Sequence, residues 1–351
     1  MSKVIIPIGY MGSGSSAITD LLAEYNSINT TNNNFECVFL HCPNGLFDLE
    51  DKLLVGNTAL RSDEAIHTFL NTMNNLYKKD GHWISNYKEK ISPDFYQYCV
   101  DFIGDLKPYK FDKVYWYYQQ NPVNFKMRFK LLLLRAFWKI SKGKIKLKRP
   151  LAYTDTMFAF PSPEEFYSAS RTFINKVLND LGKDKGNIVI DQLLLPQNLS
   201  RFGNYFDDDT RVIVVDRYPR DVYLLNKLVW CPQNWMIPLP LDEENFCKMY
   251  RSIREISVCN DPRVLCVHFE DLVYKYDETI KRIEDFIGVS SEDHKEIRQH
   301  FDPSKSIHNT QLFKRDEFKN ESVSMIEREL KDYLYPYTEE IKDVAPIDSL
   351  F

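Results

Sequence analysis

The first apolar run of the chain covers Val4 to Ile8, and a turn of small and polar residues follows it at once. After this turn, apolar residues recur at the spacing of one helical face, at Ile18, Leu21, Leu22 and Tyr25. The pattern predicts a buried strand, a tight loop and an amphipathic helix that begins near Ser15. The chain therefore opens with a strand–loop–helix unit.

Similar short apolar runs return in the second half of the chain. They cover 187–191, 211–216 and 263–269, and their continuous apolar character predicts buried parallel strands. Helical patterns at about 219–229, 243–258 and 276–287 alternate with these runs, and Gly288 ends the last of them. This alternation is typical of an α/β fold with a parallel sheet flanked by helices.

Between these regions, residues from about 60 to 180 show helical periodicity, many aromatic residues and few strand signals. We interpret this stretch as a helical insertion within one domain that spans 1–351. No internal repeat interrupts the pattern. The fold class predicted from the sequence is thus α/β with a helical insertion.

Composition narrows the class of protein. The chain is 44% hydrophobic and 27% charged, as expected of a globular protein, and its net charge of −5 argues against general nucleic-acid binding. The 7 cysteines are odd in number and form no CxxC, which favours neither a zinc site nor a complete disulfide framework. Since no apolar run approaches the roughly 18 residues of a membrane span, we predict a cytoplasmic protein without a signal peptide or transmembrane helix.

The loop after the first strand carries the clearest chemical signal. From Gly9 to Ser16 it is rich in glycine and serine, so that its backbone N–H groups can converge on an anion at the start of a helix. The kinase form of such a loop, G-x-x-x-x-G-K-[ST], is nearly met, but Ser15 stands where that form requires Lys. A site without this lysine lacks its cation for the β- and γ-phosphates, which favours a different phosphorylated donor over ATP.

Three segments together resemble the PAPS-dependent sulfotransferase family, in particular its bacterial carbohydrate-directed members, which have a P-loop-like α/β fold. Gly12-Ser13-Gly14-Ser15-Ser16 resembles the family's 5′-phosphosulfate loop, [KR]-S-G-[ST]-[ST]. Residues 215–222, VDRYPRDV, are similar to its strand-end R-x-P-[KR]-D-V. Residues 268–273, HFEDLV, followed by Phe286-Ile287-Gly288, are similar to its [YF]-E-D-L-V strand and terminal F-[IL]-G.

The resemblance implies 3′-phosphoadenosine 5′-phosphosulfate (PAPS) as the sulfuryl donor and no metal. It assigns the donor site to Gly12, Ser13, Gly14, Ser15, Ser16 and Arg217, the last as the 3′-phosphate ligand, and more loosely to Lys305. Two positions depart from the family pattern. Gly12 replaces the loop's usual Lys or Arg, and Leu225 replaces a phosphate-binding Ser, with Asn226 beside it as a polar substitute.

Transfer to a hydroxyl needs a general base, for which the sequence offers two carboxylates. Asp191 ends the strand that carries a catalytic His in some members of the family, although a structural role in capping the loop fits it equally well. Glu36 follows the polar stretch after the first helix, and carbohydrate-directed members often use Glu. The sequence does not choose between them.

The function predicted from these features is sulfuryl transfer to a carbohydrate or glycoconjugate hydroxyl, with the insertion at 60–180 shaping the acceptor site. Two alternatives stay open. One is a nucleotide or small-molecule kinase with a degenerate P-loop. The other is a catalytically silent nucleotide-binding protein, which the loss of the loop cation at Gly12 keeps in view.

A basic and apolar segment within the insertion suggests a further partner. From Lys126 to Arg149 the chain has many Lys and Arg residues and no Asp or Glu, interleaved with Phe, Leu, Trp and Ile. Such a run is usually a solvated helix face, but it is also typical of helices that lie on anionic membrane surfaces. Peripheral association with a membrane, where a lipid-linked acceptor would reside, is therefore an open prediction.

Overall fold

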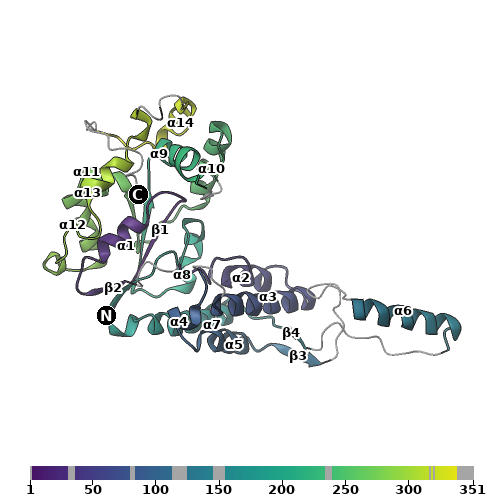
Figure 1. The fold of residues 1–351 in the computed structure, drawn as a ribbon. Helices are drawn as coiled ribbons and strands as arrows, with labels where there is room; N and C mark the ends of the chain where they lie inside the picture. Colours follow the sequence, from purple (N-terminus) through teal and green to yellow (C-terminus); the bar gives the residue numbers. More distant parts are fainter. Residues whose placement is uncertain are drawn as a thin grey trace. The chain divides into compact units, whose positions relative to one another are not determined.

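The computed structural model describes residues 2–30, 36–79, 84–112, 125–144, 155–233, 239–315, 318 and 321–337. The chain forms two compact units, drawn in Figure 1. The first unit contains Met1–Val38 and Leu178–Phe351, and the second contains Phe39–Val177. The boundaries of the second unit thus fall at 39 and 177, where the sequence suggested an insertion from about 60 to 180.

The first unit is built on a five-stranded parallel sheet with the strand order β2-β5-β1-β6-β7. The strands are β1 (Val4–Gly9), β2 (Ile28–Thr30), β5 (Asn187–Val189), β6 (Thr210–Asp216) and β7 (Val264–His268). β1 is central and pairs with β5 on one side and β6 on the other. The predicted α/β class with a parallel sheet is confirmed, and three of the four predicted strands end earlier or later than expected by one or two residues.

Helices flank this sheet on both sides, as Figure 1 shows for α1 and α12 on one side and α10 on the other. Alternate residues of the strands, such as Ile213 and Val215, pack in one core cluster with α1, α11 and α12, while their neighbours Val212 and Val214 are buried on the opposite face. Burial on both faces explains the continuous apolar runs. The helices are α1 (Ser16–Leu22), α8 (Phe202–Tyr205), α9 (Pro219–Leu224), α10 (Glu243–Ile256), α11 (Phe269–Tyr274), α12 (Tyr276–Ile287), α13 (Pro303–Ser306) and α14 (Ser324–Glu329).

The second unit is mainly helical, with α2 (Leu46–Leu54), α3 (Ala59–Tyr77), α4 (Tyr87–Lys90), α5 (Phe95–Asp105), α6 (Phe125–Ile140) and the start of α7 (Pro163–Asp180). Its core contains a cluster of edge-to-face and stacked rings from Phe39, Phe95, Phe102 and Phe173. Several of the aromatic residues of this stretch therefore form its core.

Three features of the backbone were not predicted. β3 (Tyr109–Asp112) and β4 (Asp155–Phe158) form an antiparallel pair in the second unit, and the short, polar β2 forms an edge of the main sheet. These three strands lack the apolar run that marks the other strands, because they are short and lie at sheet edges. In addition, the helix predicted at 219–229 changes from α-helix to π-helix at Leu225–Trp230.

Two further predictions concern the cysteines and membrane-spanning helices. All seven cysteines are free thiols. None of the helices in the described ranges combines the length and hydropathy that a bilayer-spanning helix requires.

The packing of the second unit gives a matched pair of glycine substitutions. A Cβ at Gly45 would lie 2.7 Å from the Phe39 carbonyl oxygen and 2.8 Å from that of Cys42, whereas a Cβ at Gly104, on α5, would meet nothing within 4 Å. We expect Gly45→Ala to destabilise the protein by about 1–3 kcal/mol, since backbone must move. Gly104→Ala should stabilise it by about 0.5–1 kcal/mol through helix propensity. Urea denaturation of both variants measures the difference, and equal free energies of unfolding would contradict the packing around Gly45.

Candidate functional site

The loop that follows β1 is held in one conformation by backbone and side-chain hydrogen bonds. Gly12 and Gly14 have φ angles of 74° and 88°, which side chains other than glycine adopt rarely. The Ser13 amide donates to the Tyr10 carbonyl at 2.8 Å, and the Ser13 hydroxyl donates to the Val215 carbonyl of β6 at 2.7 Å. The loop is thereby tied to the end of the neighbouring strand, beside Arg217.

Arg217 follows β6 and is 3% exposed. Its guanidinium donates to the carbonyl of Gly12 at 3.3 Å and to the carbonyl of Asn309, and it lies over the Phe269 ring with 4.7 Å to the centroid. Its Nε has no hydrogen-bond partner within the described part of the chain. Arg217 thus joins the phosphate loop to a segment near the C-terminus and retains an unused donor.

The buried charge of Arg217 lies near two fully buried carboxyl groups, Asp221 and Glu270. Asp221 accepts the amides of Gln311 and Leu312 at 2.8 Å each, and Glu270 accepts the Tyr218 amide at 2.9 Å. Burial raises the pKa of Asp221 to about 6 and that of Glu270 to about 8, although the charge of Arg217 opposes both shifts. Arg217 therefore lies among two acidic groups whose pKa values are set by opposing effects of burial and of its own charge.

A cavity of about 240 Å³ opens beside Arg217. It is lined by Gly14, Ser16, Ala17, Asp20, Arg217, Phe269, Gln299, His300, Phe301, Asp302, Lys305, Ser306 and Asn309. Four residues predicted for the donor site, Gly14, Ser16, Arg217 and Lys305, come from three separate parts of the sequence and meet in this one wall. A buried arginine, an exposed lysine and a glycine-rich loop around one cavity suit a ligand with more than one anionic group.

The other predicted donor-site residues lie differently. The carbonyl of Gly12 contacts Arg217, Ser13 is buried by its bond to β6, and Ser15 precedes the first residue of α1. Asn226 is fully buried, and its Nδ2 donates to the Leu239 carbonyl at 3.3 Å. It is not among the residues that line the cavity, and its contact with a donor stays a prediction.

Sequence reasoning missed most of the segment that closes the cavity, residues 299–309. This segment is held by Glu24, which is 1% exposed and accepts the amides of Arg298, His300 and Phe301 at 2.9–3.1 Å. His294 contacts the same carboxylate through Nε2 at 2.6 Å. No local sequence pattern predicts the hydrogen bonds of Glu24, since the partners lie 270 or more residues apart in the sequence.

The two carboxylates proposed as bases lie within electrostatic range of each other. Burial raises the pKa of Glu36 to about 7, and the charge of Asp191 adds to this shift. Burial also raises the pKa of Asp191 to about 6, with a further contribution from Asp20 on the cavity wall. The Cys37 amide donates to the Asp191 carbonyl at 3.4 Å, which connects the two segments. The structure therefore brings Asp191 and Glu36 near each other, and Asp191 is also within electrostatic range of Asp20 on the cavity wall.

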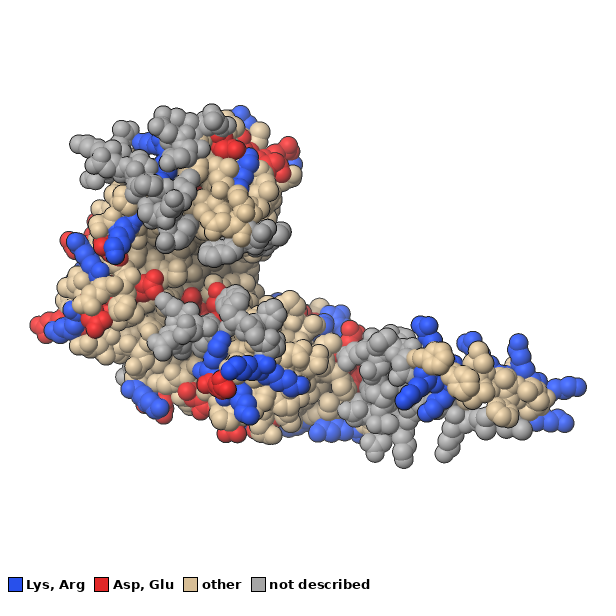
Figure 2. Space-filling view, viewed as in Figure 1, with Lys and Arg blue, Asp and Glu red and all other residues tan. Residues whose placement is uncertain are grey.

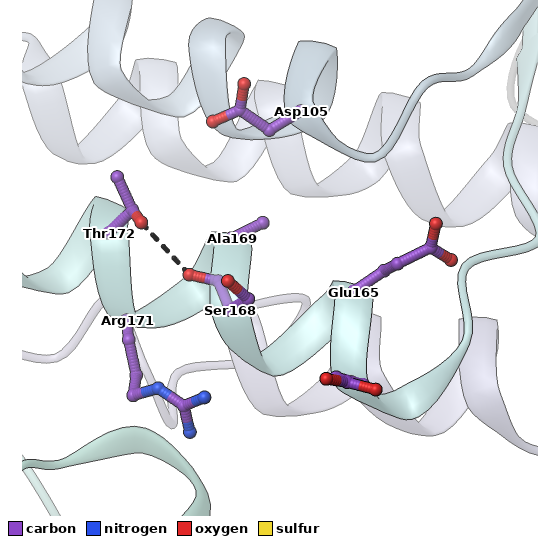
Figure 3. Close-up of a pocket in the computed structure, with 7 residues that line it drawn as sticks. Asp105, Glu165, Ser168, Ala169, Arg171 and Thr172 are labelled. Atoms are coloured by element: carbon purple, nitrogen blue, oxygen red, sulfur yellow. Dashed lines mark hydrogen bonds between the residues drawn. The ribbon is translucent and has the colours of Figure 1, made fainter.

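A second hollow lies wholly within the second unit and has a volume of about 490 Å³. Figure 3 shows its lining residues, among them Asp105 on α5 and Glu165, Ser168 and Arg171 on α7. Among its lining residues, the Thr172 hydroxyl donates to the Ser168 carbonyl at 3.0 Å, within the helix. It contains none of the residues predicted for the site.

The raised pKa of Asp191 gives a prediction about stability. Its folded pKa of about 6 exceeds the ordinary aspartate value of 3.8, so the folded state binds more protons between these values and stability falls as the pH rises through this window. Asp191→Asn removes this effect and should stabilise the protein by up to about 3 kcal/mol at pH 8 and little at pH 4. Denaturation at both pH values measures it, with Asp184→Asn on the exposed surface as control. Equal effects of Asp191→Asn at pH 4 and pH 8 would contradict the shift.

Comparison with known proteins found sulfotransferases among the solved structures to which this chain is similar. No family model and no curated protein matches it. Among solved structures, it is similar to the sulfotransferase domain of the Synechococcus PCC 7002 olefin synthase, with 12% identity over 99% of this chain and 90% of that chain, at a TM-score of 0.38. It is similar to the sulfotransferase domain of the curacin biosynthetic pathway at 13% identity, over 96% and 92% of the two chains, with a TM-score of 0.37. A sulfotransferase from Mycobacterium avium matches at 14% identity, over 97% and 78%, with a TM-score of 0.38.

Proposed function

We propose that this protein is a sulfotransferase that moves a sulfuryl group from PAPS to a hydroxyl of a carbohydrate or glycoconjugate. One observation carries the proposal. The glycine-rich loop, the buried Arg217 and Lys305 line the same cavity, although the sequence separates them widely. PAPS carries phosphate at both ends of its ribose, so two separate anionic groups would meet two separate cationic or amide-rich walls.

The division of work within the cavity follows from the geometry. The loop that ends at Ser16 would receive the 5′-phosphosulfate through its backbone N–H groups. Within the described part of the chain, the Nε of Arg217 has no hydrogen-bond partner, so Arg217 would donate to the 3′-phosphate. Lys305 on α13 would add a second cation from the opposite segment.

The chemical step needs little more than position and charge. In sulfuryl transfer, the acceptor oxygen attacks the sulfur in line with the bridging oxygen, which leaves on 3′-phosphoadenosine 5′-phosphate (PAP). The acceptor hydroxyl gives its proton to a base. Asp191 and Glu36, with pKa values raised to about 6 and 7, are stronger bases at neutral pH than ordinary carboxylates and remain largely ionised above pH 7.

A specific observation favours a second candidate, a nucleotide-binding protein without turnover. Position 12, where the resemblance expects a loop cation, is a glycine with a φ of 74°, a conformation that is unfavourable for lysine. The loop is therefore shaped for glycine, and the charge on the leaving oxygen would depend on cations elsewhere on the cavity wall. A kinase with a degenerate P-loop is less well supported, because no cation of the loop faces a γ-phosphate.

The donor site predicts a preference for PAP over ADP, since only PAP presents a 3′-phosphate to Arg217. A charge-assisted contact of this kind is worth about 1.5–3 kcal/mol, or roughly tenfold to a hundredfold in affinity. Isothermal titration calorimetry of the protein with PAP, ADP and ATP measures this preference. Equal affinities for PAP and ADP would refute the assignment, and tighter binding of ATP would favour the kinase.

Variants of the cavity wall test the same donor site, and an exposed position separates loss of binding from loss of folding. Arg217→Ala should abolish the discrimination, but it also leaves buried carboxyl groups without their cation. Lys305→Ala, on the exposed α13, should weaken PAP binding by about fivefold to tenfold and leave the fold intact. Lys331→Ala, an exposed lysine outside the cavity, is the matched control and should bind PAP as the native chain does.

The choice between the two bases can be made by substitution. If either carboxylate deprotonates the acceptor, Asp191→Asn or Glu36→Gln should lower turnover by roughly 10²–10⁴ and leave PAP affinity unchanged. Turnover of the native protein should rise with pH through about 6 to 7, because the base acts in its ionised form. Sulfate transfer from labelled PAPS to an acceptor sugar provides the measurement. A neutral result at both positions would mean that the base lies elsewhere.

A further inference from the structure

Helix α6 presents large apolar side chains to solvent. Phe125 is 83% exposed, Ile140 80%, Leu132 63% and Trp138 58%, and Phe129, Leu133 and Phe137 are exposed as well. Single exposed apolar residues are ordinary on a protein surface, but so many on one 16-residue helix are not. Such a concentration of exposed apolar side chains is typical of a surface that binds a partner.

Five apolar residues of α6 share one side of the helix, whereas the exposed Trp138 lies on the opposite side. Phe125, Phe129, Leu132, Ala136 and Ile140 follow one another at intervals of three or four residues and therefore share a side of the helix. Arg128, Arg135 and Lys139 follow the same rule along one edge of that side. Lys126 and Lys130 lie toward its other edge.

The charge of α6 has a single sign. From Phe125 to Lys144 the chain contains no Asp or Glu, although the protein as a whole carries a net charge of −5. Figure 2 shows the Lys and Arg side chains along this segment without acidic side chains among them. Exposed Lys142 and Lys144 continue the basic character beyond the helix, and the sequence keeps it to Arg149. A partner with complementary charge to α6 would therefore be anionic.

We propose that α6 docks the protein on an anionic phospholipid membrane, lying in the interface with its apolar face toward the acyl chains. Phe, Leu and Ile side chains would enter the headgroup boundary, while Lys and Arg at the edges reach the lipid phosphates. The helix is about 24 Å long and carries several charges, so it lies on a bilayer rather than crossing it.

Two other occupants fit the observations less well. A nucleic acid or another soluble polyanion would neutralise the lysines and arginines but would leave the exposed aliphatic and aromatic residues in water. A second copy of the chain would bring two α6 helices of the same charge face to face, which is unfavourable. A membrane surface satisfies both the charge and the apolar area.

The test is flotation of the full chain with vesicles of phosphatidylcholine alone and of phosphatidylcholine with 30% phosphatidylglycerol, in low salt and at about 0.5 M salt. We expect binding to the anionic vesicles in low salt, with little binding to neutral vesicles. High salt should weaken it, because the Debye length falls from about 10 Å at 0.1 M toward 3 Å at 1 M.

Two sets of variants separate charge from apolar insertion. Lys126→Gln, Lys130→Gln and Lys139→Gln combined should weaken binding to anionic vesicles by about a hundredfold. The same change at three exposed lysines outside α6, Lys185, Lys295 and Lys331, should leave it nearly unchanged. Phe125→Ser, Phe129→Ser and Ile140→Ser combined keep the charge and should weaken binding at least tenfold. Circular dichroism checks that each variant is folded.

Several results would overturn the proposal. Equal binding to neutral and anionic vesicles, or equal losses in the two lysine sets, would remove the role of the α6 charges. Full binding by the serine variant would show a purely electrostatic site for polyanions. Loss of a dimer in the α6 variants on analytical ultracentrifugation, together with absence of vesicle binding by the native chain, would assign α6 to a contact between copies of the chain.

Discussion

The site depends on one buried guanidinium. Arg217 donates to the carbonyls of Gly12 and Asn309, so a single side chain joins the loop after the central strand to the segment near the C-terminus. Two carbonyl oxygens solvate a positive charge but do not neutralise it, and a buried charge needs a partner of opposite sign. The fold can hold this charge because Asp221 and Glu270 lie close by.

Two acidic residues of the motifs bind backbone amides. Asp221 accepts the amides of Gln311 and Leu312, and Glu270 accepts the amide of Tyr218. The hydroxyl of Tyr337 donates to Asp221 at 3.2 Å, which connects a further part of the C-terminal segment to the same place. Residues 217–222 therefore have a structural role, since Arg217 and Asp221 both contact the segment 309–312.

The parts of the structure that the sequence predicted are those with local signals. The apolar run at 211–216 forms a strand of the sheet, where its side chains are buried. Gly12 and Gly14 adopt the positive φ angles that glycine allows. Elements without a local signal were missed, as were contacts between distant residues, such as those of Glu24 with the segment that closes the cavity. Asn226, suggested as a ligand by its position beside a motif, is fully buried and donates to the Leu239 carbonyl, and its contact with a donor stays a prediction.

The cavity wall and the two carboxylates are encoded in different ways. The cavity wall contains glycine, a strand end and one arginine, whose positions follow from backbone geometry, so short motifs can reveal them. Asp191 and Glu36 owe their raised pKa values mainly to burial, with a contribution from Asp191 at Glu36 and from Asp20 at Asp191. A property of this kind belongs to the folded environment and not to a residue type. For the same reason, the glycine at position 12 does not by itself decide whether the site turns over, since charge on a leaving oxygen can be balanced from any part of the cavity wall.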